Sequence, residues 1–319
     1  MSRFLIFTDL HSEIIDNPES RIEALIGATQ IYKPDFILNL GDFGYFSDTT
    51  MTLCPIEKQP VNYRYFNEQQ SDEYFNRAKR LLNILTNNVD VPIFHTIGNH
   101  DLDFASKDEV IKHLHLPHNY YYEDIDDIRL VVLDTNYYLE DGKEISYLRG
   151  NNFATGNSSI LPQEQLRWIE SVIQTDKQVV FLSHHPLNPD PRGIQNAQAF
   201  QEIINGFPDK TFVSFYGHKH VDTLKHINNA IYININSMSY FWQGEDTLLP
   251  TLDWSDEVLS DHPILPYIIR YSDPLFAVVD IKDKQLTLKG RANLTTRQMA
   301  ALDEEKGISD KISDRKVSL

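Results

Sequence analysis

Residues 3–11 read Arg-Phe-Leu-Ile-Phe-Thr-Asp-Leu-His, an apolar run that stops at a carboxylate and an imidazole. Short aromatic and β-branched runs of this kind are typical of buried strands. Later apolar runs stop in the same way, at Gly41-Asp42, Gly98-Asn99-His100-Asp101, His184-His185-Pro186 and Gly217-His218-Lys219-His220. In an open α/β sheet, ligands collect beyond the carboxyl ends of the strands. The sequence therefore predicts that these polar clusters converge at one edge of the fold.

Apolar runs alternate with amphipathic segments, which predicts an α/β fold in which helices connect strands. The predicted strands are Arg3–Thr8, Phe36–Leu40, Pro92–Thr96, Arg129–Asp134, Gln178–Ser183, Phe212–Tyr216, Ala230–Asn234, Leu275–Ile281 and Gln285–Lys289. The predicted helices are Ser20–Tyr32, Ser71–Leu85, Asp108–Leu114, Pro162–Gln174 and Asn196–Ile204. Several of these helices open with a Ser, Asp or Asn cap or with a proline in the first turn.

The length of 319 residues, 41% of them hydrophobic, allows a large core. We expect a single domain over residues 1–319. Two stretches without sustained periodicity, about 47–70 and 239–274, are predicted to be loop insertions over one face. The polar tail from about residue 295 is predicted to add a short helix and a frayed end.

The composition limits the partners of the chain. An excess of 46 acidic over 29 basic residues gives a net charge of −17, which argues against duplex nucleic acid as a partner. Cys54 is the only cysteine, so a bound metal would need nitrogen and oxygen ligands rather than thiolates. The first apolar run is too short for a signal-peptide core or a membrane span. We expect a cytoplasmic protein without membrane contact.

Each polar cluster is weak evidence by itself. An Asp-x-His sequence after a strand is usually a turn with a helix cap, and Gly-Asp is common in turns. The imidazoles of His218 and His220, two residues apart, suit a metal better. Coincidence is a poor explanation for all five clusters together, because each one ends a predicted strand.

In this order, the clusters Asp-x-His, Gly-Asp, Gly-Asn-His-Asp, His and Gly-His-x-His resemble the signature of the calcineurin-like metallophosphoesterase superfamily. The resemblance extends from about Phe4 to about Gly290. It implies a four-layer sandwich of two mixed β-sheets flanked by helices. The segments Tyr120-Tyr121-Tyr122, Arg129–Asp134 and Gln163–Ile169 look like the branch of purple acid phosphatases and class III cyclic-nucleotide phosphodiesterases.

The resemblance also implies roles for individual residues. One metal ion would be bound by Asp9, His11 and His220, a second by Asn99, His184 and His218, and Asp42 would bridge the two. Carboxylate, imidazole and amide ligands together suit Mn²⁺, Fe or Zn²⁺. Two such ions lower the pKa of a shared water, so that hydroxide can attack phosphorus at neutral pH.

The resemblance gives two neighbouring residues assisting roles and leaves a third open. His100 would contact phosphate and protonate the leaving oxygen, and Asp101 would orient His100. His185 would lie behind the metal ligands, face the substrate, or simply pack.

Tyr45 has two interpretations. The sequence Gly-Asp-Phe-Gly-Tyr at 41–45 looks like the Gly-Asp-x-x-Tyr of purple acid phosphatases, whose tyrosinate binds ferric iron. Those enzymes, however, typically have glycine at the position of His11. We favour Tyr45 as an aromatic wall of the site, which predicts a colourless or pale enzyme.

The motifs leave three functions open. Hydrolysis of phosphodiesters, including cyclic nucleotides, competes with hydrolysis of phosphomonoesters, since the motifs are shared by both. A scaffold that kept the fold and lost turnover is a third alternative, which the complete set of ligand residues disfavours. We therefore predict a dinuclear metal-dependent phosphoesterase that acts on a small phosphodiester or nucleotide. The sequence does not fix its oligomeric state.

Overall fold

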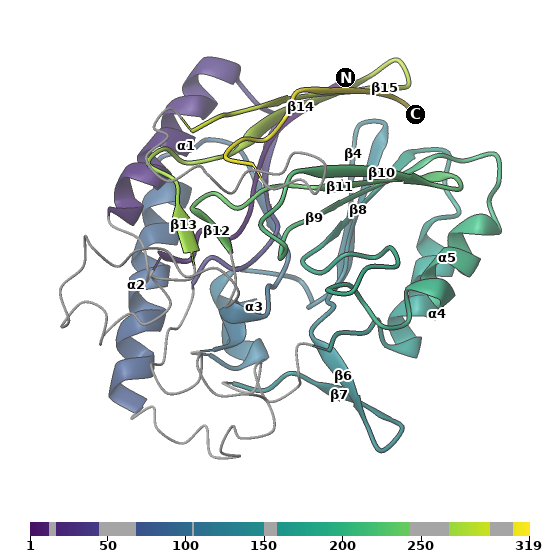
Figure 1. The fold of residues 1–319 in the computed structure, drawn as a ribbon, viewed down its shortest axis with the longest axis horizontal. Helices are drawn as coiled ribbons and strands as arrows, with labels where there is room; N and C mark the ends of the chain where they lie inside the picture. Colours follow the sequence, from purple (N-terminus) through teal and green to yellow (C-terminus); the bar gives the residue numbers. More distant parts are fainter. Residues whose placement is uncertain (13–16, 45–67, 104, 150–157, 243–267, 294–308) are drawn as a thin grey trace.

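The computed structural model describes residues 1–12, 17–44, 68–103, 105–149, 158–242, 268–293 and 309–319. Two mixed β-sheets form its centre (Figure 1), with strand orders β16-β15-β14-β1-β2-β3 and β10-β11-β9-β8-β5-β4. The first sheet contains β1 (Ser2–Phe7), β2 (Phe36–Asn39), β3 (Ile93–His95), β14 (Ala277–Lys282), β15 (Gln285–Gly290) and β16 (Arg315–Ser318). The second contains β4 (Tyr121–Ile125), β5 (Ile128–Val132), β8 (Gln178–Ser183), β9 (Phe212–Tyr216), β10 (Thr223–Ile227) and β11 (Ala230–Asn234).

Parallel strands form the middle of each sheet. Strands β1, β2 and β3 are mutually parallel, as are β5, β8, β9 and β11. Two short antiparallel pairs lie outside the sheets: β6 (Tyr137–Glu140) with β7 (Lys143–Ser146), and β12 (Tyr240–Trp242) with β13 (Ile268–Arg270). Because the parallel strands point the same way, their carboxyl ends gather on one side of each sheet.

Helices cover the outer face of each sheet (Figure 1). Helices α1 (Pro18–Tyr32) and α2 (Glu68–Asn87) lie on the first sheet, and α4 (Gln163–Val172) and α5 (Ala197–Asn205) on the second. The short 3-10 helix η3 (His100–Leu102) and helix α3 (Lys107–His113) follow β3. Ser106 and Glu109 form a capping box at the start of α3, which fixes where this helix begins.

Side-chain alternation along the strands creates the layers. In β1, Phe4 and Ile6 belong to the core between the sheets, whereas Leu5 and Phe7 pack among residues of α1 and α2. Both faces of such a strand are buried, so its sequence is continuously apolar. The order helix, sheet, sheet, helix confirms the predicted α/β sandwich.

Every strand and helix predicted before residue 290 is present within a few residues of its predicted bounds, but a strand replaces the predicted frayed C-terminal end. Arg315–Ser318 forms β16 on β15, and Arg315 Nη2 donates to Asp222 Oδ1 at 2.7 Å. Residues 239–274 were predicted as a loop, yet their ends contain β12 and β13. The rest of that stretch, most of 47–70 and the helix predicted in the tail lie outside the described residues. Within the described segments, no helix is long and apolar enough to cross a bilayer.

Candidate metal centre

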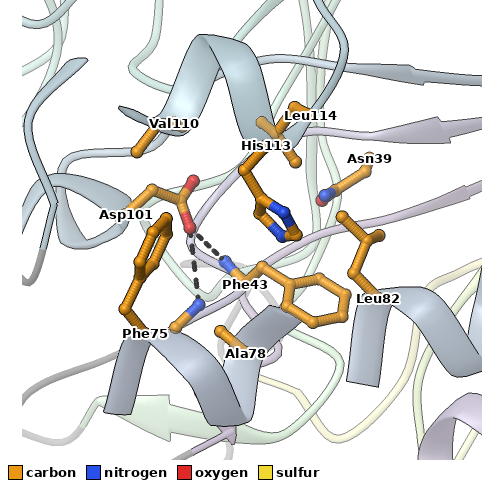
Figure 2. A pocket seen from close by; sticks show the side chains of 10 residues that line it. Asn39, Phe43, Phe75, Ala78, Leu82, Asp101, Val110, His113 and Leu114 are labelled. Carbon is orange, nitrogen blue, oxygen red and sulfur yellow. Dashed lines mark hydrogen bonds between the residues drawn. The ribbon is translucent and has the colours of Figure 1, made fainter. Parts of the chain in front are cut away.

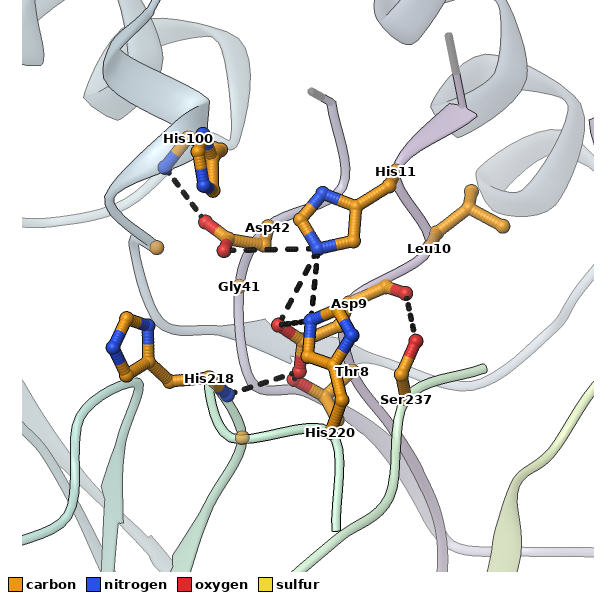
Figure 3. Close-up of polar contacts among 12 residues, drawn as sticks. Thr8, Asp9, Leu10, His11, Gly41, Asp42, His100, His218, His220 and Ser237 are labelled. Carbon is orange, nitrogen blue, oxygen red and sulfur yellow. Dashed lines mark hydrogen bonds and ion pairs between the residues drawn. The ribbon is translucent and has the colours of Figure 1, made fainter. Parts of the chain in front are cut away.

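Six of the predicted ligands meet beyond the carboxyl ends of β1, β2, β8 and β9, and Figure 3 shows five of them close together: Asp9, His11, Asp42, His218 and His220. They form two buried groups, and the ligand atoms within each group lie within 4.8 Å of one another. The first group is Asp9, His11 and His220, and the second is Asp42, His184 and His218. The structure thus brings together residues up to 211 positions apart in the chain.

In the first group, side-chain atoms that carry lone pairs face each other. His220 Nδ1 lies 3.0 Å from the carbonyl oxygen of Tyr240 and must donate to it, so a neutral His220 ring has its lone pair on Nε2. That Nε2 lies 3.1 Å from both Asp9 Oδ1 and His11 Nε2. Acceptor atoms this close need a proton or a cation between them. Two imidazoles and a carboxylate are suitable ligands for a divalent transition metal.

The second group shows the same feature. His184 Nδ1 lies 2.9 Å from the carbonyl oxygen of Leu40 and donates to it. The other ring nitrogen, Nε2, lies 3.0 Å from Asp42 Oδ2, so a proton or a cation is needed between these two atoms. Asn99 Oδ1 is buried without a donor in the part of the chain that the structure describes. A buried acceptor without a donor is costly, and a metal ion would satisfy Asn99 Oδ1 and take the place of the proton beside His184.

Asp42 lies between the groups. Its Oδ2 atom is 3.0 Å from His184 Nε2 and 3.9 Å from His11 Nε2. The backbone N–H of His100 donates to Oδ1 of the same carboxylate at 2.7 Å, which fixes its orientation. This is the position that a carboxylate shared by two metal ions would occupy.

The electrostatics of the site favour added positive charge. Burial alone would raise the pKa of Asp42, but His184 and His100 hold it well below its usual range. Burial also opposes protonation of His184, yet the charge of Asp42 raises the pKa of this imidazole to about 9. Burial lowers the pKa of His11 to about 4, so this ligand is neutral at pH 7. Asp42 and His11 are therefore already in the protonation states that metal binding requires, whereas His184 would release its proton to a metal ion.

The backbone at these positions is strained. Asp9, His11, Asp42, His218 and His220 have φ values of 52°, 48°, 54°, 66° and 53°, in the left-handed region that residues other than glycine rarely adopt. Contacts between the loops hold this conformation, because Asp9 N donates to Gly41 O at 3.0 Å and His218 N donates to Asp9 Oδ2 at 3.0 Å. Strain of this kind is concentrated at functional sites.

His100 and Asp101 require a correction. The carboxylate beside His100 Nδ1 is that of Asp103, whose Oδ2 lies 2.6 Å away, and not that of Asp101. Asp101 instead accepts backbone N–H bonds from Asp42, Phe43 and Gly98, at 3.0, 2.9 and 2.9 Å.

Figure 2 shows the Asp101 carboxylate at the wall of a largely apolar pocket, with Phe43, Phe75 and Val110 nearby. Burial, followed by the charge of Asp42, raises the pKa of Asp101 to about 6. Asp101 therefore holds the 42–44 loop against the 98–101 loop.

The remaining predicted residues have different outcomes. His185 is buried, its Nδ1 lies 2.7 Å from Thr135 Oγ1, and its ring centroid is 4.2 Å from that of His218. Of the three alternatives for His185, this geometry favours the first, a position behind the metal ligands. Tyr45 lies outside the described residues, so both of its interpretations stay predictions. Sequence reasoning missed Asp103, which only its spacing of three residues from His100 could have suggested.

Comparisons with known proteins bear on the family and the fold. The sequence model for calcineurin-like phosphoesterases matches residues 2–222. The chain is similar in structure to a dimetal phosphatase from Danio rerio, with 14% identity, 92% of this chain and 96% of that chain covered, and a TM-score of 0.60. It is also similar to GAP50, the anchor in the inner membrane complex of Plasmodium, with 11% identity, coverage of 100% and 89%, and a TM-score of 0.47. At 14% identity, the likeness to the phosphatase shows the fold alone. No curated protein matches the chain.

Proposed function

This chain belongs to the calcineurin-like phosphoesterase family, and we propose that it hydrolyses phosphoester bonds with two metal ions. The main support is the convergence of buried carboxylate and imidazole side chains in two adjacent groups. Asp42 lies between the groups, and Asn99 Oδ1 is a buried acceptor without a hydrogen bond among the described residues. A scaffold without metal chemistry has no need for this arrangement.

The proposed ligand roles follow the two groups. Asp9, His11 and His220 would hold one ion, and His184 and His218 the other. Asp42 would bind both ions, and Asn99, whose buried Oδ1 has no donor among the described residues, would complete the second set. When bound, the ions would polarise the phosphoryl group and lower the pKa of a coordinated water. Nitrogen and oxygen ligands together suit Mn²⁺, Fe or Zn²⁺.

His100 is the proposed proton donor. Asp103 accepts from its Nδ1 at 2.6 Å and thereby fixes both the tautomer and the ring orientation. The carboxylates of Asp103 and Asp42 raise the pKa of His100 against the effect of burial. A protonated ring would donate from Nε2 to the leaving oxygen, which is the step that a poor leaving group needs most.

The proposed substrate is a small phosphodiester or nucleotide. The net charge of −17 disfavours duplex nucleic acid as a substrate. The narrower assignment to purple acid phosphatases or class III phosphodiesterases stays a prediction.

Metal analysis followed by a substrate panel tests the proposal. The panel would compare p-nitrophenyl phosphate, bis-p-nitrophenyl phosphate and cyclic nucleotides, with Asp9→Asn purified in parallel to detect a contaminating phosphatase. We expect bound metal and a preference for diesters. A preference for the monoester would favour the phosphomonoesterase alternative, and a metal-loaded protein inactive on the whole panel would favour the scaffold.

A further inference from the structure

Arg192 lies beside the metal centre, on the segment that follows His184 and His185. Its Nη2 atom donates to the backbone carbonyl of His218 at 3.0 Å. The backbone N–H of His218 donates in turn to Asp9 Oδ2 at 3.0 Å. The guanidinium group is therefore attached to the same turn that presents His218 and His220.

A buried carboxylate anchors the segment that carries Arg192. Asp190, whose side chain is 2% exposed, accepts from Lys219 Nζ at 2.6 Å and lies 3.3 Å from Lys225 Nζ. It also accepts from the backbone N–H of Arg192 at 3.1 Å. Lys219 stands between His218 and His220 in the chain, so these contacts couple the position of Arg192 to the ligand turn.

Arg192 forms no ion pair among the described residues. No carboxylate there lies within ion-pair distance of its guanidinium group, and Asp190 is already paired with two lysines. The residue as a whole is exposed, so a ligand can reach its side chain. Partial burial lowers the pKa of Arg192, against the charges of Asp9, Tyr240, Asp190 and Asp42. An arginine without an acidic partner, at the rim of a metal centre, is well suited to bind an anion.

We propose that Arg192 binds a non-bridging oxygen of the substrate's phosphoryl group, and that Asp190 positions it for this contact. The inference rests on the proposed function, since the metal centre defines where the phosphoryl group lies. The planar guanidinium has five N–H donors, of which the bond to His218 uses one. The others can bind phosphate in a bidentate manner, which a lysine cannot reproduce.

Binding of inorganic phosphate to the metal-loaded protein tests the inference without turnover. Arg192→Gln removes the charge, and Arg192→Lys keeps the charge without the planar fork. Arg129→Gln is a matched control, since Arg129 also donates to a backbone carbonyl, that of Val172 at 2.8 Å, but lies at the opposite end of β5 from the metal centre. Metal content and phosphate affinity would be measured for each variant, the latter by isothermal titration calorimetry.

We expect Arg192→Gln to keep its metal and to bind phosphate about tenfold or more weakly, Arg192→Lys to be intermediate, and Arg129→Gln to match the unaltered protein. Unchanged phosphate affinity in Arg192→Gln would overturn the inference. Loss of metal from Arg192→Gln would also overturn it, because the residue would then only support the His218 turn. Failure of the unaltered, metal-loaded protein to bind phosphate would also overturn the inference. If the unaltered protein binds phosphate but hydrolyses no phosphoester, the proposed function fails while the affinity of Arg192→Gln still decides this inference.

Discussion

Replacing Asp103 with asparagine should impair proton donation by His100 and leave the metal ions in place. The two side chains meet at 2.6 Å and are only 5% and 14% exposed, so water screens the contact little. A charge-assisted hydrogen bond of this kind contributes about 1.5–3 kcal/mol. Because about 1.4 kcal/mol changes a rate tenfold, kcat should fall by about 10- to 100-fold.

The assay compares two leaving groups. An alkyl phosphodiester needs a proton on its leaving oxygen, whereas p-nitrophenolate leaves readily without one. Asp103→Asn should therefore slow the alkyl ester far more than bis-p-nitrophenyl phosphate. Asp101→Asn is the comparison, because Asp101 holds the backbone of Asp42 and Gly98. It should lower metal content and thermal stability, and slow both esters alike.

The opposite pattern would refute this reasoning. If Asp101→Asn kept its metal and lost activity only on the alkyl ester, while Asp103→Asn retained full activity, then Asp101 would orient His100 after all. The contact between Asp103 and His100 would then be irrelevant to proton transfer.

Three further predictions concern the metal centre and the core beneath it. Asp42→Asn should reduce metal occupancy and remove nearly all hydrolysis; retention of metal with near-normal turnover would contradict the bridging position. His100→Ala should keep its metal but lose several orders of magnitude in kcat on poor leaving groups and less on p-nitrophenyl esters, whereas an equal loss on both would indicate an electrostatic role. Burial lowers the pKa of His95 from 6.5 to about 3, so below pH 6.5 the unfolded chain binds more protons than the folded chain. The free energy of unfolding therefore decreases as the pH is lowered. Between pH 7 and pH 5 this loss is about 2 kcal/mol, and urea unfolding of His95→Gln should show a correspondingly smaller loss; an equal loss would show that His95 is not its source.

The sequence predicted the buried parallel strands well, because their signal is local. Strand β1 is apolar on both faces, and its run of aromatic and aliphatic residues has no other good interpretation. Edge strands carry a weaker signal. Strand β16 contains one buried apolar residue, Val317, and depends on pairing with β15 and on the contact between Arg315 and Asp222. Such long-range contacts cannot be read from local pattern, so the tail was predicted to fray.

The same distinction applies within the site. Asp9, Asp42 and His184 each lie within three residues of a strand end, so strand ends locate them. Asp103 and Arg192 follow no strand, and their positions depend on the η3 turn and on the Asp190 anchor. The position of Asp101 in the Gly-Asn-His-Asp cluster suggested a role beside His100, whereas its side chain turns toward the 42–44 loop.

The glycines explain why separate clusters in the sequence indicate a single site. A Cβ atom on Gly98 would lie 2.2 Å from Asp42 Oδ1, and one on Gly217 would lie 2.5 Å from Asp9 Oδ2. Both distances are well below van der Waals contact, so in each case the glycine of one cluster makes room for the carboxylate of another. Gly-Asn-His and Gly-His-x-His are therefore not independent turns that happen to carry ligands. The glycine of each cluster allows a close approach to the end of a different strand. The clusters therefore predicted the site when they occurred together, although no single cluster could.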